Sequence, residues 1–149
     1  GSWSGGAAKD ARLDALDALY SSNLRPSLLA CSLAASSGSP VVLTSAHASL
    51  HPCPQMVAYG AIKAAVNHMA ASVAASGTPA TVLLPAVLDT PANRAAMGET
   101  DLGSWTPCSE IAEWLVGEYR EGRLGEGKAR MVAIKTTNGK TAFSVVAND

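Results

Sequence analysis

Residues 40–44, PVVLT, and residues 80–85, ATVLLP, are short apolar runs on either side of an Ala-rich segment, QMVAYGAIKAAVNHMAASVAAS, at residues 55–76. Apolar runs of this length, bounded by proline, glycine and serine, are typical of strands buried on both faces. The Ala-rich segment has the length of a helix of several turns, and Gly77 follows it where helices commonly end. A strand, a helix and a second strand in this order predict a parallel βαβ unit.

The segment upstream of the first strand predicts another long helix. Apolar residues recur at intervals of three and four from Lys9 to about Ser36. Pro26 should kink this helix or divide it near Arg25, because proline lacks the backbone N–H and clashes with the preceding turn. A helix preceding a strand continues the alternation expected of a parallel sheet.

Downstream of the second strand the chain carries clear start, stop and turn signals. Thr90-Pro91 and Thr106-Pro107 each predict an N-cap followed by proline at the first helical position. The second of these helices ends near Gly122 and shows one apolar face, formed by Ile111, Trp114, Leu115 and Tyr119. Asn138-Gly139 separates two strand-like segments, residues 130–136 and 141–146, and predicts a hairpin.

Composition indicates one domain with a buried core. The chain has 149 residues, 48% hydrophobic and 15% charged, with a net charge of −1. This charge argues against a nucleic-acid-binding surface, and no apolar run approaches the roughly 20 residues of a membrane span. Three widely spaced cysteines, Cys31, Cys53 and Cys108, predict reduced thiols and a cytoplasmic location. The histidines form no ligand pair, so no metal site is expected.

Tyr59 and Lys63 form the candidate catalytic pair. Four residues apart on a helix, they share one face. A phenol has an ordinary pKa of about 10, and a neighbouring ammonium should lower it by favouring the phenolate. The pair therefore suits a proton donor for a reduction, with the lysine also able to bind ribose hydroxyls. A solvated Tyr/Lys pair of no catalytic role is the alternative interpretation.

Several motifs in order resemble the quinonoid dihydropteridine reductases, which belong to the short-chain dehydrogenases/reductases. Besides Tyr59 and Lys63 they are Trp3-Ser4-Gly5-Gly6, the segment LPAVLDTPANR at residues 84–94, Ser104-Trp105-Thr106-Pro107 and the terminal hairpin. The resemblance covers nearly the whole chain. It implies an α/β fold, namely the second half of a Rossmann-like doubly wound parallel sheet with a C-terminal antiparallel hairpin strand.

The resemblance also implies roles for individual residues. Tyr59 would be the proton donor, and Lys63 would tune it and bind the nicotinamide ribose of NADH or NADPH. The other cofactor-binding residues would be Gly1 and Ser2, towards the adenosine side, together with Ser45, Pro85, Val87, Leu88 and Thr90. The pterin substrate would meet Trp3, Ala46 and His47. Trp3 could instead be a buried aromatic, whereas Trp105 and Trp114 are expected to pack in the core.

Two positions are ambiguous within this resemblance. Most short-chain dehydrogenases place a serine thirteen residues before the tyrosine, where this chain has Ala46. Dihydropteridine reductases likewise lack that serine, and Ser45 and His47 are the two candidates to take its place. Asn23 lies near an asparagine that orders a water in many relatives, or it is an ordinary polar residue before Pro26.

The chain lacks the Gly-rich turn that brings a cofactor pyrophosphate to a helix N-terminus. Residues 1–149 are therefore expected to be the C-terminal part of one domain whose dinucleotide-binding half is absent. The strand at Val41 would then be an edge strand with unpaired backbone groups, which favour association. The expected partners are the missing half of the domain and a second copy of the protein, which would form a homodimer through the Ala-rich helices. Two alternatives are a non-catalytic dimerisation fragment and a short-chain reductase acting on another carbonyl or pterin.

Overall fold

The computed structural model describes residues 1–10, 12–98, 101–125 and 129–146, and its centre is a four-stranded sheet of order β1-β2-β5-β6. The strands are β1 (Val41–Thr44), β2 (Ala80–Pro85), β5 (Arg130–Thr137) and β6 (Lys140–Val146). β1, β2 and β5 are parallel, and β6 returns antiparallel to β5. This confirms the mixed α/β fold with a parallel sheet and a C-terminal antiparallel strand.

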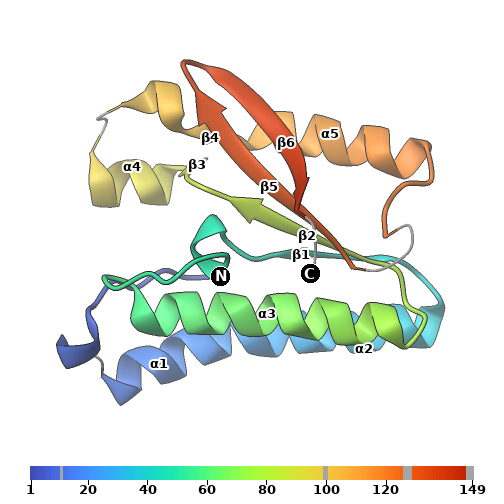
Figure 1. Ribbon diagram of the computed structural model, residues 1–149, viewed down its shortest axis with the longest axis horizontal. Helices are drawn as coiled ribbons and strands as arrows, with labels where there is room; N and C mark the ends of the chain where they lie inside the picture. Colours follow the sequence, from blue (N-terminus) through green and yellow to red (C-terminus); the bar gives the residue numbers. More distant parts are fainter. Residues whose placement is uncertain (11, 99–100, 126–128, 147–149) are drawn as a thin grey trace.

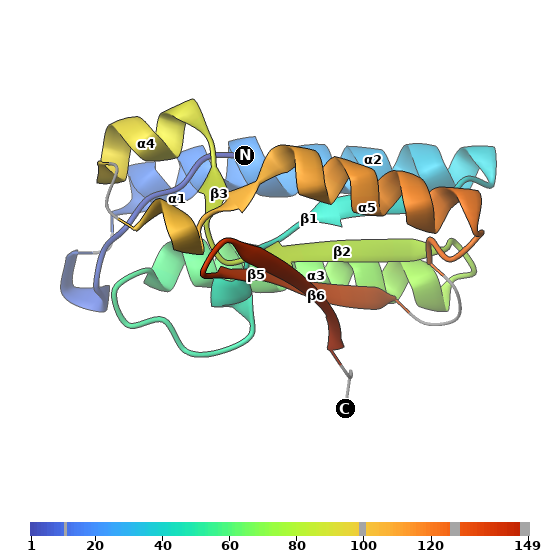
Figure 2. The ribbon, with the colours of Figure 1, turned by 90° about the horizontal axis from the view of Figure 1, so that it is seen from above.

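Helices cover both faces of the sheet (Figure 1). One face carries α1 (Leu13–Leu19), α2 (Arg25–Ser37) and α3 (Val57–Ala75). The other carries α4 (Pro91–Met97) and α5 (Cys108–Arg120), with the small parallel sheet of β3 (Leu88–Asp89) and β4 (Thr106–Pro107) beside them. Single turns of 3-10 helix lie at Ala8–Asp10, His47–Ser49 and Leu102–Ser104. The view from above shows the four strands lying in order from β1 to β6 (Figure 2).

β2 divides its side chains between two cores because successive residues of a strand point to opposite faces. Val82 and Leu84 pack with Val66 and Ala70 of α3, and all four are fully buried. Leu83 joins the second core, under α5, where the partly buried residues Ile111, Trp114 and Leu115 pack. Both faces of β2 are therefore dry, as the continuous apolar run predicts.

The long upstream helix is divided where proline predicts. A π-helical segment, Tyr20–Leu24, separates α1 from α2, and Pro26 is the second residue of α2. The missing N–H of Pro26 leaves a carbonyl of the preceding turn without its usual partner, which favours a wider turn at this point. Asn23, in the π segment, is 4% exposed.

Most of the local signals are confirmed in the structure. Gly77 has φ +96° just beyond α3, and Asn138 and Gly139 have φ +50° and +72° in the hairpin turn. The Thr90 hydroxyl accepts a hydrogen bond from the Asn93 amide at 3.2 Å, so Thr90 is an N-cap as predicted. Trp105, 6% exposed, lies in the core as expected.

The predicted N-cap at Thr106 is wrong. Thr106 and Pro107 form β4, α5 begins at Cys108, and Pro107 supplies no side-chain cap. The Thr106 hydroxyl is instead fully buried and hydrogen-bonded to the Thr136 hydroxyl of β5 at 2.8 Å. The hydroxyl oxygen that was expected to cap the helix is therefore hydrogen-bonded to a residue of another strand inside the core.

The predicted apolar face of α5 is confirmed for three residues and wrong for Tyr119. Trp114 stacks on Phe143 of β6 with ring centroids 5.0 Å apart, whereas Tyr119 is 69% exposed. The inward position of this last turn belongs to Glu118, which is 5% exposed. Helical spacing from Ile111 places residue 118 on the buried face as readily as residue 119, and the partners of Glu118 decide between them.

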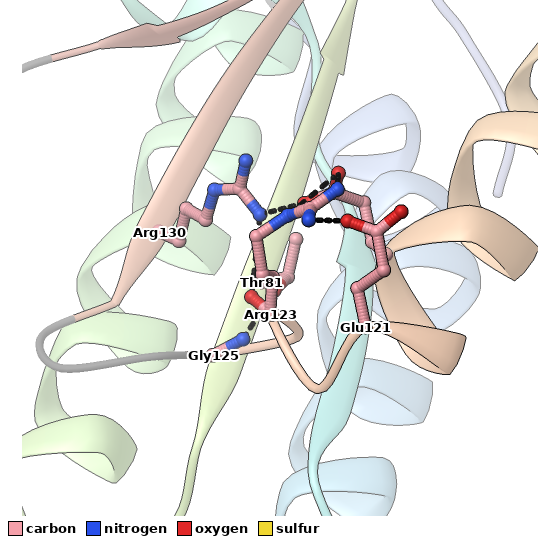
Figure 3. A network of polar contacts seen from close by, with 6 residues as sticks. Thr81, Glu121, Arg123, Gly125 and Arg130 are labelled. Carbon is pink, nitrogen blue, oxygen red and sulfur yellow. Dashed lines mark hydrogen bonds and ion pairs between the residues drawn. The ribbon is translucent and has the colours of Figure 1, made fainter.

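Those partners are two arginines (Figure 3). Glu118 accepts hydrogen bonds from Arg123 at 2.6 Å and from Arg130 at the start of β5. Arg123 also pairs with Glu121, and the Arg130 guanidinium lies 5.4 Å from the centre of the Trp114 ring. The arginines hold the pKa of Glu118 below its ordinary value. The network ties the end of α5 to the amino end of the sheet.

Gly125 closes the same corner. Its amide donates to the buried Thr81 hydroxyl of β2 at 2.9 Å, and its φ is +73°. A Cβ at this position would overlap Pro79 and the Ala80 amide. Glycine is therefore required both for the backbone conformation and for the close approach.

β1 is an edge strand, since among the described residues it pairs with β2 and with no other strand. Val41 and Leu43 are buried against the helices, whereas Val42 is 37% exposed and Thr44 is exposed. On the outer surface of α2, Leu28, Leu29 and Leu33 are each about 60% exposed. Apolar surface is therefore uncovered on this side of the molecule.

Candidate active site

Tyr59 and Lys63 lie in the first two turns of α3, at the carboxyl ends of β1 and β2. The Lys63 ammonium donates to the Thr44 carbonyl, at the end of β1, at 3.0 Å. It also lies 5.7 Å from the centre of the Tyr59 ring. The helix thus brings the two side chains together, as the spacing predicts, at the edge of the sheet where ligands commonly bind in α/β folds.

Burial controls the acid–base properties of both residues. Lys63 is 6% exposed and forms no salt bridge to a described residue, so burial lowers the pKa of its ammonium. Burial also raises the pKa of the half-buried Tyr59. The expected lowering of the Tyr59 pKa by Lys63 is therefore wrong, because desolvation outweighs an ammonium that hydrogen-bonds to Thr44 instead of the phenol.

Asn23 and Gly1 complete a polar cluster beside Lys63. The Asn23 amide nitrogen donates to the carbonyls of Leu19 and Ser2, both at 3.1 Å. Its Oδ1 is buried and has no hydrogen-bond partner among the described residues. A Cβ on Gly1 would overlap that oxygen and lie 3.6 Å from the Lys63 nitrogen. The first residues of the chain thus reach Lys63, and Asn23 is part of the same cluster.

The segment after β1 separates the two candidates for the missing serine. Ser45 is 2% exposed, and its hydroxyl donates to the Lys63 carbonyl at 2.8 Å. That hydroxyl is committed to the protein interior. Ala46 is 5% exposed, whereas His47 is half-buried with its ring centroid 6.1 Å from that of His51. Of the two, His47 keeps a side chain that a ligand could reach.

The segment after β2 is held by internal hydrogen bonds. The Val87 carbonyl accepts from the Thr106 amide at 2.8 Å, and the Leu88 carbonyl accepts from the Asn93 side chain at 2.8 Å. Pro85 is the buried last residue of β2, and Thr90 caps α4. This places Pro85, Val87, Leu88 and Thr90 in a braced loop at the carboxyl end of β2.

Sequence reasoning missed the ion pair that braces this loop. Arg94 of α4 binds Asp89 with two hydrogen bonds, of 2.6 and 2.8 Å. The arginine holds the pKa of Asp89 below its ordinary value. The sequence contained a signal for this ion pair. Asp89 lies just before the Thr90-Pro91 helix start and Arg94 just after it, and the first turn of the helix brings the two charges together.

Trp3 is an exposed aromatic surface at the start of α3. It is 58% exposed, and its indole N–H points to the Met56 sulfur at 3.3 Å. The loop that carries it is fixed by a hydrogen bond from the Gly6 amide to the Gln55 carbonyl at 2.8 Å. The alternative of a buried Trp3 is therefore wrong.

The described part of the chain contains no group of three or more His, Cys, Asp or Glu residues arranged to hold a metal ion. Within the same residues, no helix has the length and apolarity needed to cross a membrane. The polar groups beside Lys63 are the Tyr59 phenol, the Asn23 amide and the Thr44 carbonyl. These groups suit proton transfer and binding of a hydroxylated ligand.

Comparison with known proteins identifies relatives of the chain. No family model matches it. A dihydropteridine reductase from Dictyostelium discoideum is 37% identical over 125 residues, which cover 77% of this chain and 54% of that protein. The chain thus spans about half the length of this relative.

Solved structures share the fold at lower sequence identity. A short chain dehydrogenase from Mycobacterium avium matches 100% of this chain and 53% of its own, with a TM-score of 0.70 and 17% identity. A putative oxidoreductase from Escherichia coli K-12 has a TM-score of 0.71, with 89% of this chain and 59% of its own covered at 17% identity. A short chain dehydrogenase/reductase family protein reaches a TM-score of 0.73 at 20% identity.

Proposed function

Because the chain is a relative of dihydropteridine reductase and has the fold of short-chain dehydrogenases/reductases, we propose that the complete protein reduces quinonoid dihydropteridine to tetrahydropteridine. NADH or NADPH is the proposed reductant. The observation that carries the proposal is the Tyr59–Lys63 pair at the carboxyl ends of the parallel strands, with a buried ammonium that no described carboxylate neutralises.

The protonation state of Tyr59 suits reduction. Reduction of the pterin requires one hydride and one proton, so the acid must carry its proton before the step. Burial raises the pKa of Tyr59, which keeps the phenol protonated through neutral pH. Once the proton has gone to a pterin nitrogen, the phenolate is stabilised by the nearby Lys63 ammonium. Lys63 then acts on the product side of the transfer, and need not ionise Tyr59 beforehand.

The residues present fit a nicotinamide cofactor. The ammonium of Lys63 has three N–H groups, and among the described residues it donates a hydrogen bond only to the Thr44 carbonyl. The remaining donors, with the unpartnered Asn23 oxygen beside them, suit the hydroxyls of a ribose. The reduced nicotinamide, when bound, supplies the hydride.

Other parts of the site are assigned by the resemblance. Pro85, Val87, Leu88 and Thr90 would face the nicotinamide from the braced loop after β2, with Gly1 and Ser2 as further cofactor contacts. Ser45 would act through its bond to the Lys63 carbonyl. The pterin would lie among Trp3, Ala46 and His47, where the exposed indole offers a stacking face.

The exposed surfaces favour two partners. We propose that the dinucleotide-binding half of the domain continues the sheet beyond β1, whose free edge and exposed Val42 it would cover. A second copy would cover the outer faces of α2 and α3. The leucines of α2 and the exposed Ala61 and Ala64 of α3 suit close packing of helices. A cytoplasmic location is proposed from the three free cysteines.

The proposed function is tested with the complete protein and freshly generated quinonoid dihydropteridine. Oxidation of NADH and of NADPH is followed in separate reactions, with a simple ketone as the comparison substrate. Pterin-dependent oxidation of one nicotinamide, with little turnover of the ketone, is the expected result. No pterin-dependent oxidation with either nicotinamide would contradict the proposal, and preference for the ketone would favour a carbonyl reductase.

A further inference from the structure

A buried polar cluster joins the loop after β1 to the middle of α3. Its members are Ser45, Ser49 and Asn67. Asn67 lies on the same face of α3 as Tyr59 and Lys63, one turn beyond the lysine, and is 8% exposed. Its neighbours on the buried side of the helix include Val66 and Ala70, which are fully buried and apolar. A leucine would suit this environment, so the amide calls for an explanation.

The Ser49 hydroxyl is the centre of the cluster. It donates its proton to the Ala46 carbonyl at 2.6 Å. It accepts a hydrogen bond from the Asn67 amide nitrogen at 2.8 Å, and the Ser45 hydroxyl oxygen lies 3.3 Å away. A hydroxyl has one proton and two lone pairs, and here the proton and one lone pair are used. The bonds therefore run in one direction, from Asn67 through Ser49 to the Ala46 carbonyl.

The second attachment point is Lys63 itself. The Ser45 hydroxyl donates to the Lys63 carbonyl at 2.8 Å. The turn that presents Ala46 and His47 is thus tied to α3 at two points, the lysine carbonyl and the Asn67 amide. The cluster touches no reacting atom, yet it determines where this turn lies relative to the helix that carries Tyr59.

Within the part of the chain that the structure describes, the cluster leaves one buried polar atom unpaired, which lowers the stability of the fold. The Asn67 Oδ1 is buried without a hydrogen-bond partner among the described residues. Leaving a buried acceptor unpaired is unfavourable, and an apolar side chain of similar size would avoid it. A polar group kept at such a position is explained if the orientation it imposes on the neighbouring loop is needed.

We propose that Ser49 and Asn67 are positioning residues that hold the Ala46–His47 turn against α3, and so set the place of the pterin beside Tyr59. The inference rests on the proposed function for the identity of the ligand. Its structural part, the attachment of the turn to the helix, holds whatever the substrate is.

The test uses the complete protein with Ser49→Ala, Asn67→Leu and the double variant. Ser72→Ala is the matched control, because its hydroxyl also donates to a carbonyl of α3 but lies at an exposed position. Ser49→Thr, which keeps the hydroxyl, is the conservative variant. Two readouts are taken: amide hydrogen exchange at Ser49 and Leu50, whose amides close the turn at 3.0 and 3.1 Å, and the KM for each substrate.

Loss of the cluster should speed exchange at these two amides by about tenfold or more, because local opening becomes easier. The KM for the pterin should rise about tenfold and kcat should fall by about threefold, since the pterin is displaced relative to Tyr59, while the KM for NADH stays within about twofold. Exchange and pterin KM in the double variant should change no more than in either single variant, because each of the three variants breaks the same hydrogen-bonded unit. Ser49→Thr, which keeps the hydroxyl, should stay close to wild type in both readouts.

Two results would overturn the inference. One is exchange in Ser49→Ala and Asn67→Leu equal to that of Ser72→Ala. The other is an equal rise of both KM values with no recovery in Ser49→Thr, which indicates general loosening. Failure of the wild-type protein to reduce the pterin would instead overturn the proposed function, and the exchange readout would still decide whether the turn is held by this cluster.

Discussion

The two ends of the parallel strands differ in how their buried charges are paired. At the amino end, the Glu118 carboxylate is 5% exposed and is bound by Arg123 and Arg130. At the carboxyl end, the Lys63 ammonium is 6% exposed and meets a carbonyl and an aromatic ring, with no carboxylate among the described residues. The first arrangement satisfies itself. The second leaves a buried cation with no opposite charge among the described residues.

Unpartnered amide oxygens mark the same difference. Both buried oxygens without partners, those of Asn23 and Asn67, lie near Lys63, and none lies near Glu118 among the described residues. Buried polar groups are normally paired, because leaving them unpaired is unfavourable. The contrast indicates that the amino end stabilises the fold, whereas the carboxyl end holds the unpaired polar groups that the proposed function requires.

The largest expected effect is on turnover, from Tyr59→Phe. Removing a positioned proton donor should lower kcat by about 10²- to 10⁴-fold, with the melting temperature nearly unchanged. Steady-state kinetics of pterin reduction by the complete protein measures this. Tyr119→Phe, at an exposed tyrosine of α5, is the control and should behave as wild type. Equal losses in both variants would remove Tyr59 from the mechanism.

Glu118→Gln should act on stability and leave catalysis alone. Loss of this carboxylate removes the buried charge that Arg130 and Arg123 bind, while Arg123 keeps Glu121, which should lower the free energy of unfolding by about 2 kcal/mol. The kcat of the folded protein should stay within about twofold of wild type. Chemical denaturation and kinetics on the same preparation provide both numbers. A large fall in kcat with unchanged stability would reverse the roles assigned to the two ends.

A smaller effect is expected on acidification. The pKa of Glu118 is lowered in the folded protein, so the unfolded chain takes up the proton first as the pH falls. Its contribution to stability is therefore complete above about pH 5 and is lost below about pH 4.3, the ordinary glutamate value, as the pH approaches the lowered one. Unfolding measured across this range should show a steeper loss for wild type than for Glu118→Gln. Parallel curves would contradict it.

The framework of the fold is encoded locally and could be predicted. Apolar runs, Gly77, Asn138-Gly139 and Pro26 act through their own backbone preferences, and the structure confirms each of these elements. Tyr59 and Lys63 could be paired for the same reason, since helical spacing alone brings them together. Local chemistry was sufficient for these elements and this pair, although the Asp89–Arg94 ion pair, which is also local, was missed.

The parts that could not be predicted depend on partners distant in sequence. The Thr106 hydroxyl bonds to Thr136, 30 residues away, and so does not cap α5. Glu118 is buried in place of Tyr119 because Arg130 comes from β5. The direction of the Tyr59 pKa shift failed similarly, because desolvation depends on how the surrounding elements pack, which spacing does not show.

Lys63→Met tests the contrast between the two ends most directly, with unfolding free energy and NADH binding measured on the same complete protein. Because the change removes a buried cation without a carboxylate partner among the described residues, we predict a gain in stability of about 1 kcal/mol. We predict at the same time that NADH binds at least about tenfold more weakly, as expected for a lost charged hydrogen bond. A variant that is less stable than wild type, or that binds NADH equally well, would contradict the claim that this end of the sheet keeps its charge for a ligand.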